Sequence, residues 1–202
     1  MTREDELEAL ATANGWNFSI EDHDDLILLP FRFFSGGVAH GVTDVIEGAR
    51  GGRDVVAFDY EVAAVTMGML ETPTTFDSSC AVVALPAVCP ELMVSHETTG
   101  HWLTHPTHHE VFVHERPDFA RGFRITTTDP AFAAAVFDDA LERWFLGELP
   151  DHDLCFEISG PWLMAFTHQR EAAQVPMIMD AAIAVADHIP TAAFDGLPAP
   201  SA

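Results

Sequence analysis

The sequence contains no lysine: all 9 of its cationic residues are arginine, against 32 Asp and Glu, and the formal net charge is −23. A surface of this charge repels the phosphates of nucleic acids and the anionic headgroups of membranes. Scattered arginines among so many acids do not form the basic patch that a nucleic-acid interface needs. We therefore expect no nucleic-acid partner. The same charge keeps a chain with 48% hydrophobic residues in solution.

Cysteine and long apolar runs are also scarce. Cys80, Cys89 and Cys155 are widely spaced, with no CxxC pair, and the acidic residues 1–6 are unlike a secretory leader. These features predict reduced, mostly buried thiols in a cytoplasmic protein. The longest apolar region, 175–189, is interrupted by aspartates, so we expect no membrane insertion.

The motifs of several large enzyme classes are missing. The sequence has no GxSxG, no Walker A motif and no GxGxxG. Cys155 lies in an alternating apolar run, which favours a core strand over a catalytic thiol. Arg50 and Arg53 flank a glycine pair that indicates a hairpin tip, with an anion site as the alternative. We expect no catalytic residues and no cofactor, with zinc as the alternative considered below.

Histidine is abundant in one segment, residues 96–114. His96 and His101, in the run HETTGH, resemble the HExxH motif of zinc proteases. That motif places its histidines four residues apart, on one face of a helix. These two are five residues apart and would lie on different faces of a helix. The sequence therefore does not predict a zinc protease of this type.

A different zinc site is the alternative in the same segment. His101 and His105 have the helical i, i+4 spacing, and His108, His109 or Glu110 would complete a tetrahedral set of ligands. We favour instead a solvated His-rich loop, in which nearby carboxylates raise the proton affinity of the imidazoles.

Hydrophobic periodicity predicts an α+β fold. Residues 42–47 and 55–62 alternate as strands do, and Gly51-Gly52 between them supplies the positive φ of a tight hairpin turn. Thr2 and Asp5 form a capping box for a first helix that ends at Asn14-Gly15. Further strands are expected at 16–20, 81–85, 92–94, 110–114 and 123–127, a second hairpin at 154–158 and 162–166, and helices at 130–147 and 176–189.

Strands joined by short turns predict a mainly antiparallel sheet covered by three helices, which is a two-layer sandwich. We expect one domain over residues 1–202, with 1–190 folded and 191–202 a flexible tail. Phe58, Val136, Phe137 and Trp144 are expected in a single core.

Methionine and aromatic residues in presumed loops are an ambiguous feature. Such residues either fold back onto the core, which we favour, or form an adaptable binding patch. They are Phe31, Phe33, Phe34, Met67, Met69, Leu70 and Phe76.

Three sequence features together resemble a known family: residues 117–145, which begin PDFARGFRITTTDPAF and end at Trp144-Phe145, the pair Gly15-Trp16, and residues 56–60, VAFDY. They resemble an uncharacterised actinobacterial family of α+β domains, some of whose relatives are joined to membrane segments. The resemblance spans residues 5–189 and implies a fold, but no activity and no site residues. The His-rich segment, the acidity and the lack of a membrane segment depart from that family.

These observations favour a non-catalytic, acidic cytoplasmic domain that binds a protein partner or a small ligand. The alternative is a metal-dependent enzyme that uses residues 96–114 and zinc.

Overall fold

A computed structural model of the chain describes residues 2–21, 23–35, 39–65, 73–96, 110–112, 116–149, 153–168 and 170–200. The strands are β1 (Asn17–Ser19), β2 (Ala39–Arg50), β3 (Arg53–Val65), β4 (Pro73–His96), β5 (Glu110–Phe112), β6 (Phe123–Thr127) and β7 (Cys155–Thr167). The α-helices are α1 (Arg3–Asn14), α2 (Asp24–Ile27), α3 (Pro117–Gly122), α4 (Pro130–Val136), α5 (Asp139–Glu148) and α6 (Val175–His188). Short 3-10 turns are η1 (Arg32–Ser35), η2 (Ala172–Gln174) and η3 (Thr191–Phe194).

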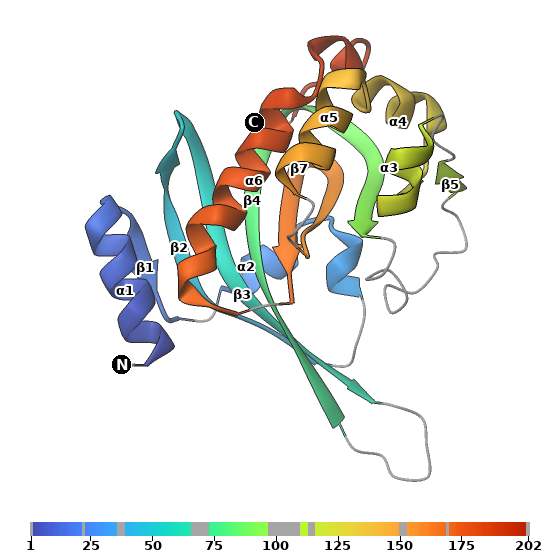
Figure 1. Ribbon diagram of the computed structural model, residues 1–202. Helices are drawn as coiled ribbons and strands as arrows, with labels where there is room; N and C mark the ends of the chain where they lie inside the picture. The colour runs from blue at the N-terminus through green and yellow to red at the C-terminus, as the bar shows by residue number, and fades with distance from the viewer. Residues whose placement is uncertain are drawn as a thin grey trace.

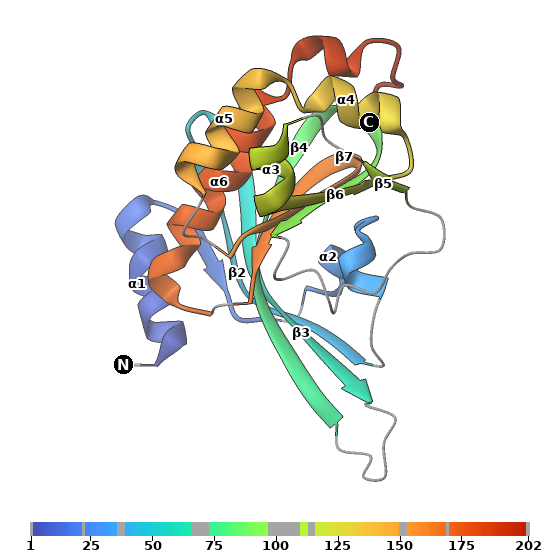
Figure 2. The same cartoon turned by 45° about the vertical axis from the view of Figure 1, so that its right-hand side comes forward.

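The strands form one 7-stranded sheet in which every pairing is antiparallel. Its order is β1-β2-β3-β4-β6-β5, and β7 pairs with β4 as well. Helix α6 lies across β3, β4 and β7 on one face of the sheet, and α2 lies on the other face (Figures 1 and 2). The predicted α+β class with a mainly antiparallel sheet is confirmed.

The first helix begins and ends where its capping residues predict. The Thr2 N–H donates to Asp5 Oδ2 at 2.8 Å, and the Asp5 N–H donates to Thr2 Oγ1 at 3.2 Å. Gly15 ends the helix with a φ of 70°, in the left-handed region that glycine adopts without strain.

The β2–β3 hairpin also matches the prediction. Gly51 and Gly52 form its turn with φ values of 61° and 84°. At the tip, Arg50 pairs with Asp180 and Arg53 pairs with Asp187, both of α6. The two arginines thus attach the hairpin to the helix layer. This agrees with the interpretation as a hairpin tip and not with an anion site.

Strand β4 is longer than predicted. The two strands expected at 81–85 and 92–94, with Pro86 and Pro90 between them, are one strand that runs without interruption from Pro73 to His96. The prolines lie where the β4–β7 register shifts, between Ala84 and Cys89 and between Cys89 and Leu92. In a bulge some residues donate no hydrogen bond to the neighbouring strand. Proline has no N–H to donate, so a bulge accepts it where a regular strand would exclude it.

The predicted hairpin at residues 154–166 is wrong for a related reason. Both halves belong to the single strand β7, and both pair with β4. Gly160 has a φ of 56° and lies opposite Cys89 in the irregular part of the ladder. The Ser-Gly-Pro signal therefore marks a bulge and not a chain reversal.

The helix expected at residues 130–147 is two helices. Asp129 caps α4, and its carboxylate accepts the N–H groups of Ala131 and Phe132. Asp138 repeats this arrangement for α5 and accepts from Ala140 and Leu141 at 3.0 and 2.9 Å. A second good N-cap inside the apolar stripe starts a new helix there. With six α-helices in the described ranges, the expected three were too few.

The sheet carries buried apolar residues on both faces, so the predicted single core is wrong. Val136 and Phe137 are buried on the helix side, and Trp144 is half-buried against that cluster. Phe58 is buried on the opposite face with Tyr60 and Phe166. The period-2 alternation of β3 explains this, because neighbouring residues of a strand point to opposite faces.

The last described residues pack against the body of the protein. Ala193 is buried, and Phe194 and Leu197 contact the helix-side core. The Val88 N–H donates to the Pro198 carbonyl at 2.8 Å. The flexibility of residues 191–202 stays a prediction. Within the described ranges, no helix has both the length and the hydropathy needed to cross a bilayer.

Trp16 and Gly48 generate a stability prediction. A Cβ on Gly48 would lie 2.1 Å from Trp16 Cδ1, whereas one on Gly41 in the same strand would have no neighbour within 4 Å. We expect Gly48→Ala to lower the free energy of unfolding by about 1–3 kcal/mol through overpacking. Gly41→Ala should change it by less than about 0.5 kcal/mol. Urea denaturation of both variants measures this, and equal effects would contradict the close packing.

Candidate functional site

The predicted zinc ligands His101, His105, His108 and His109 all lie outside the described residues. Among the residues that the structure does describe, no group of three or more His, Cys, Asp or Glu side chains is placed to hold a metal ion. The zinc site therefore stays a prediction for the His-rich segment.

The three thiols are unsuited to nucleophilic chemistry. Cys80, Cys89 and Cys155 are free and buried. Burial raises the pKa of Cys89 to about 11 and that of Cys155 to about 12, and it also raises the pKa of Cys80. A thiol is reactive as the thiolate, so these groups are inert at neutral pH. The interpretation of Cys155 as a core residue is confirmed.

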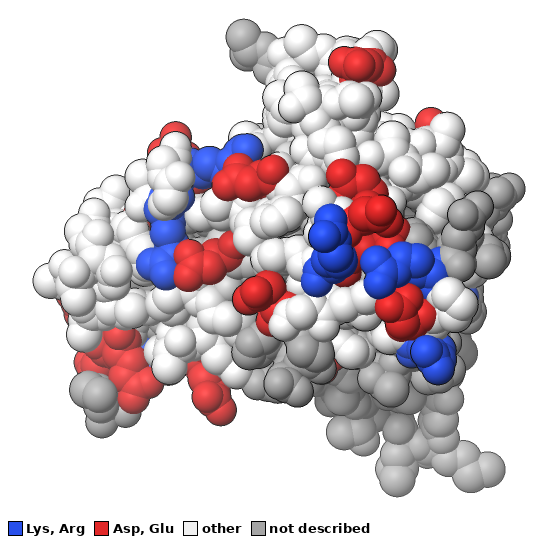
Figure 3. All heavy atoms as spheres, turned by 45° about the horizontal axis from the view of Figure 1, so that its top comes forward, with Lys and Arg blue, Asp and Glu red and all other residues white. Residues whose placement is uncertain are grey.

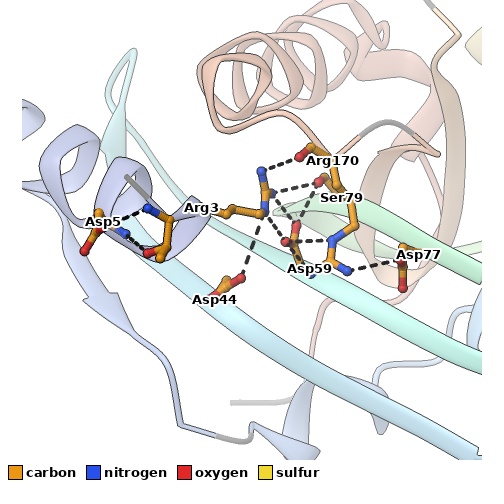
Figure 4. Close-up of polar contacts among 8 residues, drawn as sticks. Arg3, Asp5, Asp44, Asp59, Asp77, Ser79 and Arg170 are labelled. Atoms are coloured by element: carbon orange, nitrogen blue, oxygen red, sulfur yellow. Dashed lines mark hydrogen bonds and ion pairs between the residues drawn. The ribbon is translucent and has the colours of Figure 1, made fainter.

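A group of partly buried charges is centred on Asp59 of β3, on the helix side of the sheet (Figure 4). Asp59 is 3% exposed. Arg3 of α1 forms a two-pronged ion pair with it, with Nε–Oδ2 at 2.6 Å and Nη2–Oδ1 at 2.8 Å. Arg170 approaches the same carboxylate at 3.0 Å, and the Ser79 hydroxyl donates to it at 2.7 Å. Asp59 is thus neutralised by two guanidinium groups.

The Asp59 cluster joins three parts of the chain. Arg3 also donates to the Arg170 carbonyl at 2.6 Å, and Arg170 pairs with Asp77 of β4 at 3.2 Å. A cation in the first turn opposes the helix dipole of α1, so the position of Arg3 is explained by this tertiary contact. The cluster holds α1 and the chain before η2 against the sheet, and we assign it a structural role.

Asp44 borders this cluster in an unusual backbone conformation. It has a φ of 54° and lies within the register shift of β2 between Thr43 and Ile46. Burial raises the pKa of its carboxyl group, and the negative charge of Asp59 raises it further. Arg3 Nε lies 4.0 Å from Asp44 Oδ2 and opposes this effect.

The cluster gives a prediction about buried and exposed ion pairs. Asp59→Asn removes the charge that neutralises Arg3 and Arg170, and we expect a loss of about 3 kcal/mol in the free energy of unfolding. Asp180→Asn breaks the surface pair with Arg50 and should cost less than about 1 kcal/mol. Chemical denaturation of both variants is the measurement. A loss at Asp59 no larger than that at Asp180 would show that the cluster does not hold α1 in place.

A second buried acid lies on the opposite face of the sheet. Glu157 of β7 is 1% exposed and sits in the apolar second face. Its Oε1 accepts the Arg32 N–H at 2.6 Å, and its Oε2 accepts the Phe33 N–H at 3.1 Å. Burial raises the pKa of Glu157 to about 7, against the lowering effect of these two N–H groups. This carboxyl group therefore titrates near neutral pH.

Glu157 holds an aromatic segment over the second face. Phe33 lies 4.2 Å from Phe166 and 5.1 Å from Tyr60, measured between ring centroids. Phe34 lies 4.9 Å from Tyr60, and Phe31 is buried beside it. These phenylalanines fold back onto the sheet, as favoured from the sequence. Met67, Met69 and Leu70 lie outside the described residues, and Phe76 is 41% exposed.

The chain just before these phenylalanines carries exposed acids, while its Leu26, Ile27 and Leu29 are partly buried against the second-face core. None of the residues of α2 is buried, and Leu28, which follows it, is 83% exposed. Asp24 and Asp25 are exposed in the same turn. Ile20 is 59% exposed, and the Ser19 hydroxyl beside it contacts His23 Nε2 at 3.1 Å. We call the residues Ile20, Asp24, Asp25 and Leu28 the α2 surface.

Cationic side chains are largely occupied by acids. Arg3, Arg50, Arg53, Arg116 and Arg170 each form an ion pair with Asp or Glu. On the face in Figure 3, blue arginines lie directly beside red acidic groups. An arginine already paired in this way is less available to a phosphate. The absence of a nucleic-acid partner stays a prediction.

The sequence singled out neither Asp59 nor Glu157. Each is an acid inside an apolar strand, where a charged side chain needs a partner from elsewhere in the chain. That pattern was visible, but the partners were not. Arg3 is 56 residues from Asp59, and Arg32 is 125 residues from Glu157.

Comparison with known proteins identifies one similar fold. No protein-family model matches the chain, and no curated protein matches it. The crystal structure of the mycobacterial trehalose monomycolate transport factor A, TtfA, is similar, with a TM-score of 0.67 and 11% sequence identity over 98% of each chain. At this identity the likeness shows the fold alone. The actinobacterial family suggested by the sequence stays a prediction.

Proposed function

We propose that this chain is a non-catalytic domain that binds a protein partner through the α2 surface, in the cytoplasm as its sequence suggests. The observation that carries the proposal is the 83% exposure of Leu28 on an acidic turn. Leu28 and Ile20 both expose aliphatic surface, and burial of that surface against a partner would be favourable. It does not line an enclosed cavity, so a protein is favoured over a small ligand.

The charge of the chain indicates the chemistry of this partner. Asp24 and Asp25 are exposed in the turn that leads to Leu28, and the whole chain has a formal charge of −23. A complementary surface has an apolar centre with Lys or Arg around it. Such a partner gains from burial of Leu28 and is steered to the site by the acidic field.

Two further observations support a binding role without catalysis. The buried Asp59 is fully engaged by Arg3 and Arg170, and the thiols are held protonated by burial. The similar structure, TtfA, is named as a transport factor.

Site-specific photo-cross-linking in the cells that produce the protein tests this proposal. p-Benzoylphenylalanine in place of Leu28 should give a discrete adduct with one partner protein, identified by mass spectrometry. The same group in place of Ala134, an exposed residue of α4, should not give that adduct. Asp24→Asn combined with Asp25→Asn should weaken the adduct at position 28. No adduct at position 28, or the same adducts at both positions, would contradict the proposal.

A further inference from the structure

The α2 surface and the buried phenylalanines belong to one continuous stretch, residues 23–35. Its first half contributes no fully buried side chain from α2, and its second half buries Phe31, Phe33 and Phe34. Leu26, Ile27 and Leu29 are partly buried against the second-face core, and the second half adds its own attachment to the sheet, so both fix the position of Leu28 on the surface.

Strand β7 supplies this attachment through two side chains on one face. Glu157 accepts the N–H groups of Arg32 and Phe33, at 2.6 and 3.1 Å. Ser159, two residues further along the strand, donates its hydroxyl to the Pro30 carbonyl at 2.8 Å. Residues two apart in a strand point to the same face, so both side chains contact the stretch from the second face of the sheet.

We propose that the Glu157 carboxyl group is a titratable latch that holds residues 23–35 on the second face and so sets the position of the α2 surface. The effect of the latch on partner binding rests on the function proposed above, whereas the attachment of residues 23–35 by Glu157 does not depend on that function. It is a positioning device: Glu157 is buried under the stretch, holds the N–H groups of Arg32 and Phe33, and acts on Leu28 through the backbone between them.

The direction of the pH effect follows from the surroundings of Glu157. Burial raises its pKa to about 7 from an ordinary value of 4.5, the N–H groups and the charge of Arg32 lower it, and Glu91 raises it. Cys80, which lies on the same face of the sheet, is neutral because burial raises the thiol pKa. Release of the stretch would hydrate the carboxyl group and return its pKa to the ordinary value.

The held state therefore binds a proton more tightly than the released state. The latch is most stable below the released pKa of 4.5, weakens as the pH rises towards about 7, and weakens no further above that value. Each unit of pKa difference changes the ratio of held to released molecules about tenfold. The stretch should thus be closed in mild acid and looser at alkaline pH.

Hydrogen exchange of the free protein tests the latch without any partner. Protection factors, corrected for intrinsic rates, are measured by mass spectrometry at pH 5.5 and 8 for peptides covering residues 24–35, with α6 as the internal reference. In the wild type, protection of this stretch should fall about tenfold or more relative to α6 between the two pH values. In Glu157→Gln, which cannot titrate, the fall should be less than about threefold.

A second variant keeps the test decisive if Glu157→Gln does not fold. Ser159→Ala removes a hydrogen bond that does not titrate, so it should lower protection by the same factor at both pH values. The proposal is overturned if the wild-type stretch loses no protection relative to α6, or if Glu157→Gln keeps the full pH dependence. Because no partner is present, either result leaves the photo-cross-linking test of the α2 surface untouched.

Discussion

The backbone ladder of β4 is the interaction on which the rest of the fold depends. This strand of 24 residues pairs with β3, β6 and β7, and β2 and β5 join the sheet through β3 and β6. Its side chains alternate between the faces: Ala81 and Val83 lie in the helix-side core, and Cys80 and Val82 lie on the opposite side. A strand that is apolar on both faces requires both to be covered.

The two faces are covered in different ways. Helices α1, α5 and α6 bury the first face with apolar side chains, and the Asp59 cluster attaches the N-terminal end of α1. The second face is covered by residues 24–35, which contain only one-turn helices and carry their own backbone N–H groups into the apolar layer. Glu157 accepts two of these groups. The cost of burying that acid is the origin of its raised pKa.

Local sequence signals predicted the features that local chemistry determines. The capping box of Thr2 and Asp5 and the Gly51-Gly52 turn are set by residues within a few positions of each other, and both are confirmed. Pro86 and Gly160 were misread because turns and bulges use the same residue types. Only the strand pairing along the whole of β4 distinguishes a bulge from a turn at these positions.

The functional interpretation was harder to obtain from sequence, because it depends on contacts between distant residues. Alternation placed Phe58 and Asp59 on opposite faces of β3 but did not show that the far face has its own core. The acidity of the chain was evident, yet the exposure of Leu28 depends on how Leu26, Ile27 and Leu29 pack on the second face and on how residues 30–34 attach to β7. The predicted zinc ligands form a separate hypothesis in the His-rich segment.

The central claim is that Glu157 is a buried carboxyl group that fastens the cover of the second face. The most direct measurement is a carbon-13 NMR titration of the Glu157 side-chain carboxyl, assigned by comparison with Glu157→Gln. Our account predicts a midpoint near the value of about 7 that burial produces. A midpoint near the ordinary value of 4.5 would show a hydrated carboxyl group and would contradict both the cover and the latch.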